Sequence, residues 1–477
     1  MTNKLNEVLN EKFGYSTFRP GQEEAIESVL AGKDTLVMLP TGMGKSLCYQ
    51  LPAYVQEGTT LIVSPLLSLM QDQVENLRLQ GERGVVALNS LTSYSERRRI
   101  FQQIEHYRFI YTSPEMLQNN HVLQALKRVN IRLFVVDEAH CISHWGTDFR
   151  PDYLVLADVR KQLKNPVTIA LTATATAHVR QEIIQFLGLT NEATNQIVLS
   201  VDRPEIKYIV EYCQGNKLGK ILYYIQNIQG PGIIYFMSKK LAEQTAEILH
   251  EQYKINVGTY HSDIESDDKI KIQQQFLQDE LQIICATSAF GMGFDKKDIR
   301  FIIHYHLPDS PEMYLQEVGR AGRDGKESLA VLLYQPGDEQ IQKRFLEEAL
   351  PTKDILEEAS KRNTFNEEPL FKLAHYFIQA HTSMNKALET IAVRKEIKNQ
   401  QLNYMIQYVF HKECKRKYLL NYFNEEKKED LTFCCSNCGL NMEKTFAQLN
   451  KVSPKIYKKE KTIKSWKTIF EVMYNKQ

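Results

Sequence analysis

The 477-residue sequence contains no long hydrophobic run, no low-complexity block and no short-period repeat. No apolar stretch reaches the ~18 residues that suggest a membrane-spanning helix. The N-terminal segment, Met1 to Leu30, mixes charged with apolar side chains and lacks the apolar core of a signal peptide. These absences predict a soluble, cytoplasmic protein that does not act at a membrane.

Net charge is nearly absent as well, at +1, so it neither supports nor excludes a nucleic-acid partner. The charge is uneven near the end of the chain, where Lys451 to Gln477 contain eight lysines against two glutamates. This segment is either a solvated basic tail or a tail that contacts phosphates. The second reading has a physical basis, because lysines displace condensed counterions from a nucleic-acid backbone.

The length predicts two to four domains. Short β-branched runs alternate with helical patterns, which indicates an α/β fold with parallel sheets covered on both faces. The first runs are Thr35–Leu39, Thr60–Ser64, Phe109–Thr112, Leu133–Val136 and Thr168–Leu171; the second set is Gly232–Phe236, Asn256–Thr259, Gln282–Ala286, Phe301–His304 and Ala330–Leu333. We expect lobes at 1–205 and 206–338, joined near Val201–Lys207. A mainly helical, cysteine-bearing part at 339–445 and a basic tail at 446–477 should follow.

A phosphate-binding loop is predicted directly after the first strand, in the run PTGMGKS at residues 40–46. Glycines let backbone N–H groups curl around an anion, and the next helix presents its positive end to it. Lys45 supplies a charge for the β- and γ-phosphates, and Ser46 a hydroxyl for Mg²⁺. The loop residues that we expect to contact ATP are Thr41, Gly42, Met43, Gly44, Lys45 and Ser46.

Two acidic residues follow the apolar strand that ends at Val136. Asp137 is expected at the carboxyl edge of the sheet, where it can hold Mg²⁺, and Glu138 can deprotonate the attacking water.

Further along, Arg320 and Arg323 occur in the run GRAGRD and are expected on one face of a helix. Arginines stabilise charge on a transferring phosphoryl group, although a purely structural pairing with acids such as Glu317 or Asp324 is the alternative. Because these arginines belong to the second lobe, we expect ATP to be sandwiched between the lobes and hydrolysis to control their closure.

These motifs, together with LTATA at residues 171–175, resemble those of superfamily 2 helicases. The segment FGYSTFRPGQ at residues 13–22 resembles the adenine-recognition motif of the RecQ branch. The resemblance implies that Gln22 reads an adenine edge while Tyr15 and Arg19 stack on the nucleotide. It also implies two RecA-like lobes and a helical zinc-binding subdomain.

The segment AHCISHWGTDFRP, residues 139–151, resembles the aromatic-rich loop that follows the acidic box in this family. The resemblance implies that Trp145 and Phe149 stack on DNA bases and that Arg150 binds a phosphate or the neighbouring site. The alternative is that the aromatic side chains are core residues. His144 stands where the family has glutamine, which leaves its role open.

Eight cysteines divide into four scattered ones and a cluster, Cys414, Cys434, Cys435 and Cys438. In a reducing compartment such a cluster favours a metal over disulfides. The cluster resembles the RecQ zinc module, but Asn441 occupies the place of an expected cysteine. Either Cys434 replaces the missing ligand and all four bind Zn²⁺, or the module is degenerate and metal-free. The basic, aromatic helix after Cys414 either lines DNA or is a half-buried structural helix.

The chain ends about 40 residues after Cys438, which is short for the winged-helix domain of longer relatives and leaves no room for an HRDC domain. We therefore expect a short bacterial RecQ-type helicase that is monomeric, cytoplasmic and associated with the nucleoid. Its cofactors are ATP, Mg²⁺ and Zn²⁺, and its partners are single-stranded and branched DNA, with single-strand-binding or recombination proteins as candidates. By resemblance it moves 3′ to 5′. The alternatives are an RNA helicase and an ATP-switched nucleic-acid-binding protein that does not unwind.

Overall fold

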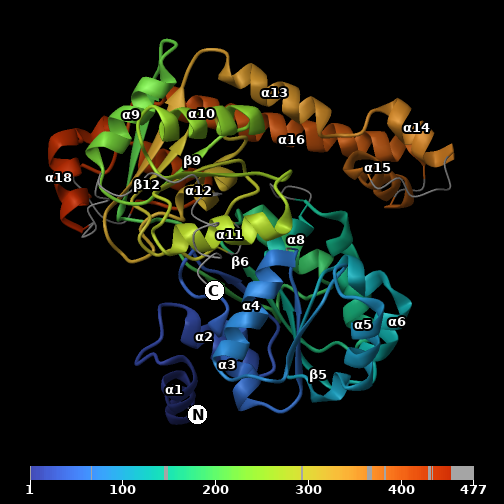
Figure 1. The fold of residues 1–477 in the computed structure, drawn as a ribbon. Coiled ribbons are helices and arrows are strands. Elements are labelled where there is room, and N and C mark those ends of the chain that lie inside the picture. The colour runs from blue at the N-terminus through green and yellow to red at the C-terminus, as the bar shows by residue number, and fades with distance from the viewer. Residues whose placement is uncertain are drawn as a thin grey trace. The chain divides into compact units, whose positions relative to one another are not determined.

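The computed structural model describes residues 2–65, 67–143, 149–291, 294–361, 368–380, 383–427, 431 and 433–452. The chain divides into two compact units, Met1–Val201 and Asp202–Gln477, which Figure 1 shows as the blue-to-teal and the green-to-red parts. No helix in the described part of the chain is both long and apolar enough to cross a membrane.

The first unit is built on a parallel sheet. Its strands are β1 (Thr35–Met38), β2 (Thr59–Val63), β3 (Val85–Leu88), β4 (Phe109–Thr112), β5 (Ile131–Val136), β6 (Val167–Thr172) and β7 (Asn195–Val198). Among the described residues they lie in the order β3-β4-β2-β5-β6-β1-β7. The inner strands are buried along almost their whole length, as a sheet covered on both faces requires.

The helices of the first unit are α1 (Thr2–Phe13), α2 (Gln22–Leu30), α3 (Leu47–Val55), α4 (Leu67–Leu79), α5 (Tyr94–Gln102), α6 (Asn120–Leu126), α7 (Leu156–Gln162) and α8 (Ala177–Phe186). Side chains from the sheet and from α2, α3 and α4 form one core cluster, with Val37, Ile62, Phe109 and Ile169 at its centre. This core fixes β1 and α3, which flank the predicted phosphate loop.

The second unit has a parallel sheet of its own. Its strands are β8 (Ile206–Tyr212), β9 (Gly232–Tyr235), β10 (Val257–Tyr260), β11 (Ile283–Ala286), β12 (Phe301–His304) and β13 (Ser328–Tyr334). Within the described ranges the order is β10-β11-β9-β12-β13-β8. The expected α/β class and tandem parallel-sheet lobes are confirmed. Lys207, which we had placed in the joining segment, lies instead within strand β8.

The second unit continues into a helical region. Its helices are α9 (Lys217–Asn227), α10 (Lys239–Glu251), α11 (Ser266–Leu277), α12 (Pro311–Val318), α13 (Asp338–Glu348), α14 (Lys353–Lys361), α15 (Pro369–Ala380), α16 (Met384–Phe410), α17 (Lys415–Tyr422) and α18 (Met442–Val452). Figure 1 shows α14 and α15 gathered at one end of the long α16. There Leu356, Phe377 and Ile391 contribute to a small separate core.

The cysteine-bearing segment and α18 pack against the sheet of the second unit. Tyr208 in β8 forms an isolated parallel bridge with Cys435, and its N–H donates to the Cys434 carbonyl at 3.2 Å. Phe446 and Leu449 of α18 join the core of the same lobe. The predicted start of the basic tail at residue 446 therefore falls inside a packed helix, and residues 453–477 of that tail lie outside the described residues.

Candidate nucleotide site, arginine loop and cysteine cluster

The phosphate loop connects β1 to α3 at the carboxyl edge of the first sheet. Gly42 and Gly44 have φ angles of 86° and 74°, a left-handed conformation that glycine adopts without strain. Lys45 and Ser46 are partly exposed at the start of α3. The loop thus presents a cation, a hydroxyl and a helix N-terminus at one place, the arrangement that binds a polyphosphate.

The side chains of Gln22 and Arg19 donate hydrogen bonds to the carbonyl groups of this loop. The Gln22 amide donates to the carbonyls of Met43 at 2.8 Å and Gly44 at 3.0 Å, and its oxygen accepts the Arg19 N–H at 2.9 Å. The Arg19 guanidinium donates to the Gly42 carbonyl. Gln22 is buried, so an adenine that engaged its amide would have to exchange these bonds. Tyr15 is 52% exposed and open to stacking.

The acidic pair follows β5 on the same sheet edge. Burial and the Glu138 charge raise the pKa of Asp137 to about 7, while the Lys45 charge opposes this shift. Because the charge of Lys45 acts on Asp137, the phosphate loop and the acidic pair lie near each other on this sheet edge. Glu138 has a φ of 47°, a strained conformation for a residue with a side chain and one that is common at functional sites.

His140 connects the acidic pair to the next strand, a link that the sequence analysis did not predict. Its Nδ1 lies 3.0 Å from the Thr172 hydroxyl and 3.4 Å from the Glu138 carboxylate. Thr172 ends β6 and belongs to the LTATA segment. His140 thus lies between the Glu138 carboxylate and the segment at residues 171–175. The DEAH-type spacing of His140 was the signal available in the sequence.

The two arginines do not lie on a helix, contrary to our expectation. Helix α12 ends at Val318, and Arg320 and Arg323 lie in the turns that follow. We name residues 319–323 the arginine loop. Gly322, with a φ of 62°, helps to turn the chain there, because glycine tolerates the left-handed region.

Both guanidinium groups nevertheless reach the same neighbouring segment. Arg320 donates to the Gly291 carbonyl, and Arg323 donates to the Phe294 carbonyl and the Asp295 carboxylate, both at 2.8 Å. The buried Nε atoms of both arginines make no hydrogen bond with any described residue. Buried donors without partners are costly, so these two atoms keep an unused capacity to donate hydrogen bonds.

The structural pairing that we had considered is observed for one arginine, because Arg323 pairs with Asp295 at 2.8 Å. Among the described residues, neither Glu317 nor Asp324 is the acid that pairs with an arginine of this loop. Glu317 interacts with His304 at 2.8 Å, and Asp324 interacts with Arg300 at 2.7 Å. Burial lowers the pKa of Arg323, and the nearby charge of Arg320 acts in the same direction. The loop therefore concentrates positive charge, and among the described residues its acidic partner is Asp295, which pairs with Arg323.

The four clustered cysteines come together, with their Sγ atoms all within 4.8 Å of one another. Cys414 and Cys434 are 3.5 Å apart, and Cys435 and Cys438 are 3.4 Å apart. Around a tetrahedral Zn²⁺ with bonds of about 2.3 Å, the sulfur atoms would be about 3.8 Å apart. The cluster therefore fits Zn²⁺ with little adjustment.

Local hydrogen bonds support the cluster. The N–H of Lys415 donates to Cys435 Sγ at 3.3 Å, and hydrogen bonds from Cys414 and Cys434 lower the pKa of Cys435. Asn441, at the place of an expected cysteine, has its side-chain oxygen 3.0 Å from the Lys444 N–H. It thus caps the start of α18, which accounts for this departure from the family pattern.

The aromatic-rich loop is described only in part. Trp145 lies outside the described residues. Phe149 is buried, at 9% exposure, and Arg150 donates to the Pro65 carbonyl at 2.8 Å. Contact of these residues with DNA stays a prediction.

In α17, Lys415 and Arg416 are 2% and 1% exposed, so these two cations belong to the fold and not to a DNA surface.

Three family models match consecutive parts of the chain. The DEAD/DEAH box helicase model matches residues 19–183, and the helicase conserved C-terminal domain matches residues 213–325. The RecQ zinc-binding model matches residues 336–439. The three matches thus cover the phosphate loop, the arginine loop and most of the cysteine-bearing helical region.

Curated relatives are similar over most of the chain. The probable ATP-dependent DNA helicase RecS of Bacillus subtilis is 42% identical over 92% of this chain and 92% of its own length. The ATP-dependent DNA helicase RecQ of the same organism is 36% identical over 92% of this chain and 67% of its own length. Among solved structures, Mss116p bound to ssRNA and AMP-PNP has a TM-score of 0.60 at 17% identity, covering 88% of this chain and 89% of that one. This last likeness concerns the fold alone.

Proposed function

Because the chain belongs to the RecQ family of ATP-dependent DNA helicases, we propose that it hydrolyses ATP to move along single-stranded DNA and to unwind duplex or branched DNA. The observation that carries the proposal is the nucleotide site of the first unit. There the phosphate loop and the acidic pair share one sheet edge, and the charge of Lys45 acts on Asp137.

The residues of this site have distinct proposed roles in hydrolysis. Lys45 and the N–H groups of residues 41–46 bind the β- and γ-phosphates. The Ser46 hydroxyl and the Asp137 carboxylate hold Mg²⁺, which neutralises phosphate charge when bound. Glu138 accepts the proton of the attacking water. Arg320 and Arg323 offer their unpartnered Nε donors to the charge that develops on the γ-phosphoryl group.

The remaining predicted roles concern ligand recognition and metal binding. We propose that Gln22, Arg19 and Tyr15 bind the adenine end of ATP, and that Trp145, Phe149 and Arg150 sense DNA. All four clustered cysteines are proposed to bind one Zn²⁺ as thiolates, closing a structural site. This metal would hold α17 and the segment that bridges to β8 in place.

The polarity, cellular setting and partners extend the proposal by family likeness. We propose 3′-to-5′ movement, a monomeric motor and a role in recombination or repair of nucleoid DNA in a bacterial cytoplasm. Single-strand-binding and recombination proteins are the candidate partners. The division into lobes at 1–205 and 206–338, a helical zinc-binding part at 339–445 and a short C-terminal tail belongs to the same proposal.

The proposal is tested by strand displacement on duplex DNA with a single-stranded tail at either the 3′ or the 5′ end. We expect ATP-dependent displacement on the 3′-tailed substrate only, and none with Lys45→Ala. Displacement of the 5′-tailed substrate alone would overturn the polarity. ATP hydrolysis without displacement of either substrate would indicate an ATP-driven switch.

An RNA substrate is the alternative outcome of a companion assay. Single-stranded DNA and single-stranded RNA of matched sequence are added to the enzyme, and the stimulation of ATP hydrolysis is compared. We expect DNA to stimulate strongly and RNA weakly. Stronger stimulation by RNA would replace the DNA helicase by an RNA helicase of the same fold.

A further inference from the structure

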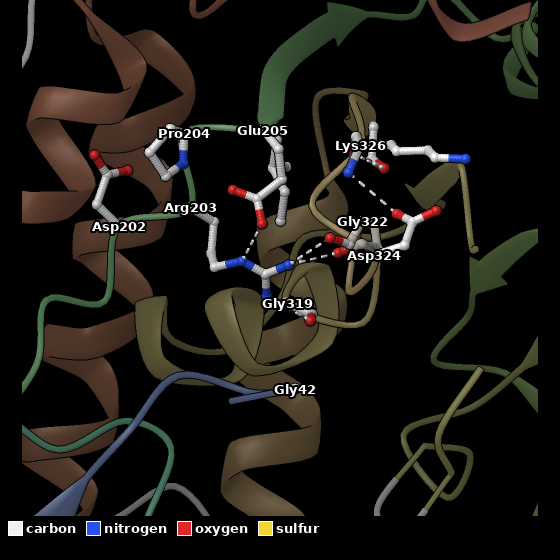
Figure 2. Close-up of polar contacts among 12 residues, drawn as sticks. Gly42, Asp202, Arg203, Pro204, Glu205, Gly319, Gly322, Asp324 and Lys326 are labelled. Atoms are coloured by element: carbon white, nitrogen blue, oxygen red, sulfur yellow. Dashed lines mark hydrogen bonds and ion pairs between the residues drawn. The ribbon is translucent and has the colours of Figure 1, made fainter. Parts of the chain in front are cut away.

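Arg203 holds the arginine loop by its backbone. It lies just before β8, and its guanidinium donates to the carbonyls of Gly319 at 3.0 Å, Ala321 at 3.0 Å and Gly322 at 3.1 Å. The Nε atom of Arg203 donates to the Glu205 carboxylate at 2.6 Å. Figure 2 shows this arrangement, with Arg203 reaching from its own segment to the loop. One side chain thus binds the chain directly before Arg320 and between the two arginines.

The contact is charge-assisted and shielded from solvent. Arg203 is only 11% exposed at its side chain, and its acceptors include the carbonyl groups just after α12. A cation at the C-terminal end of a helix is stabilised by the helix dipole and by the unpaired carbonyls there. Its charge also adds to the positive field at Arg323, where it acts to lower the pKa after burial and Arg320. Arg203 therefore stabilises the shape of the loop and also strengthens its attraction for an anion.

Arg416 in turn fixes the segment that carries Arg203. From α17 it donates to the Arg203 carbonyl at 2.9 Å and to the Ile206 carbonyl and the Asp202 carboxylate. Its side chain is 1% exposed and lies over the Tyr208 ring at 5.1 Å. These bonds span more than two hundred residues of sequence, 214 in the case of Asp202. The segment 202–206 is thereby anchored on the helix that follows the first cysteine.

These contacts form a continuous path from the cysteine cluster to the arginine loop. Cys414 caps α17, α17 supplies Arg416, and Arg416 holds segment 202–206, from which Arg203 holds the loop. We propose that Arg203, supported by Arg416, is a positioning residue for ATP hydrolysis that sets the place of Arg320 and Arg323. This inference rests on the role given to those two arginines in the proposed function. Its physical basis is that catalytic charges must be placed to within a fraction of an ångström.

The test compares steady-state ATP hydrolysis, stimulated by single-stranded DNA, in the full chain and in Arg203→Ala. We expect kcat to fall ~10-fold or more, as misplacement of a catalytic group can cost about 10²-fold. The KM for ATP should change far less, because the phosphate loop is untouched. Guanidinium at a non-denaturing concentration should restore part of the lost kcat, since it can occupy the vacated site and donate to the same carbonyls.

Lys217→Ala is the matched control for loss of a buried cation in the same unit. Lys217 pairs with Asp338 at 2.6 Å, both side chains being under a tenth exposed. Among the described residues its ammonium donates to the Tyr305 carbonyl and the Asp338 carboxylate, and not to the arginine loop. Its variant should lower the melting temperature as much as Arg203→Ala while leaving kcat near that of the unchanged enzyme. Should Arg203→Ala fail to fold, Arg203→Lys decides by the same readout and should retain an intermediate kcat.

Arg416→Ala and the double variant test the serial arrangement. Since Arg416 acts through Arg203, the double variant should lose no more kcat than Arg203→Ala alone. Each of three results would overturn the proposal. The kcat of Arg203→Ala could lie within twofold of the unchanged enzyme, or Lys217→Ala could lose as much kcat as Arg203→Ala. In the third, the loss of kcat in the double variant would equal the product of the two single losses. If Arg320→Ala hydrolyses ATP normally, the proposed role of the arginines fails, and with it the premise. If Arg320→Ala is inactive but Arg203→Ala is not, the positioning role alone fails.

Discussion

The phosphate loop of the first unit and the arginine loop of the second unit are held in opposite ways. The phosphate loop is fixed by the side chains of Gln22 and Arg19, about twenty residues away in the sequence, and leaves Lys45 and Ser46 partly exposed. In the arginine loop, Arg320 is 5% exposed and the Arg323 side chain 7% exposed, and an arginine from a distant segment binds its backbone.

The difference indicates two kinds of preorganisation. The phosphate loop keeps the charge of Lys45 accessible for binding. Loss of this charge should therefore lower the rate of catalysis much more than the stability of the fold. The arginine loop keeps its charges desolvated, which strengthens their interaction with an anion but makes them part of the lobe's packing. Changes there should affect catalysis and stability together.

Lys45→Ala should give one of the two largest losses of hydrolysis, together with Arg320→Ala, and it separates activity from stability most cleanly. Removal of one preorganised phosphate contact costs on the order of 10²–10³-fold in rate. Because Lys45 is partly exposed, the melting temperature should change little. Hydrolysis assays and thermal unfolding of the same preparation check both. A variant that loses its fold as well would mean that the phosphate loop, like the arginine loop, depends on buried charge.

Loss of the zinc cluster should be next in size and acts on the second unit alone. Cys435→Ser removes a buried thiol that contacts the three other cysteines of the cluster and the Lys415 N–H. Since structural zinc contributes folding energy directly, we expect loss of bound zinc and a destabilisation of several kcal/mol. Elemental analysis and thermal unfolding measure the two.

Cys285→Ser is the matched control, because Cys285 is equally buried in the same unit and lies outside the cluster. It should keep its zinc and lose only the cost of burying a hydroxyl, about 1–3 kcal/mol. Equal zinc content in Cys435→Ser and the unchanged protein would show that Cys435 is not a ligand. Zinc absent from the unchanged protein would favour the degenerate module.

Gly291→Ala tests the arginine loop through its acceptor. A β-carbon at Gly291 would lie 2.1 Å from Arg320 Cζ, so the guanidinium must move. We expect kcat to fall ~10-fold or more. Gly337→Ala shares a positive φ, 104°, but its β-carbon would meet nothing within 4 Å. That control should lose about 1 kcal/mol of stability and keep its kcat; equal kcat in both variants would contradict the assigned place of Arg320.

Glu312→Gln should give the smallest effect, a change in pH dependence. Glu312 lies in α12 and accepts the Tyr422 hydroxyl at 2.6 Å. Burial raises the pKa of Glu312 to about 7 from 4.5, although the Tyr422 hydrogen bond and the Lys398 charge oppose the shift. The folded state then binds more protons than the unfolded state between these values, so Glu312 lowers stability as pH rises through that window.

The amide cannot ionise and should remove this slope. We expect Glu312→Gln to be more stable than the unchanged protein above pH 7, on the order of 1–3 kcal/mol, and about equal near pH 4.5. Denaturant unfolding across this pH range measures the difference. Parallel stability curves for the two proteins would show that the carboxyl group of Glu312 is not raised in pKa.

Within the described ranges the inner strands were predictable from the sequence, whereas three of the four edge strands were not. All ten expected strands form, within one or two residues at their ends. The three unexpected ones, β3, β7 and β8, lie at sheet edges. An inner parallel strand reads as a continuous apolar run, whereas β7 has one buried residue in four. In β8, alternating lysine, tyrosine and glutamate conceal a strand that α17 and the cysteine segment cover.

Motif residues were predictable because they occur at a fixed spacing in the sequence. Their partners come from distant segments and follow no such pattern. Glycines, acids and cysteines at fixed spacing indicate Lys45, Asp137 and the metal cluster, because residues close in sequence form these sites. Arg203 and Arg416 find their partners 116 and 214 residues away. Basic residues near aromatic ones usually lie at the surface, so Arg416 was read as a possible DNA contact.

We propose that Lys45 and Arg320, which belong to different units, contribute to the same hydrolysis reaction, and Arg320→Ala tests this proposal most directly. ATP hydrolysis is measured at saturating single-stranded DNA for the unchanged chain and this variant, with nucleotide affinity measured in parallel. We predict a loss of on the order of 10³-fold or more in kcat with nucleotide affinity within a few-fold of the unchanged chain. Hydrolysis by Arg320→Ala at the unchanged rate would contradict the account, because the second unit would then contribute nothing to the chemistry.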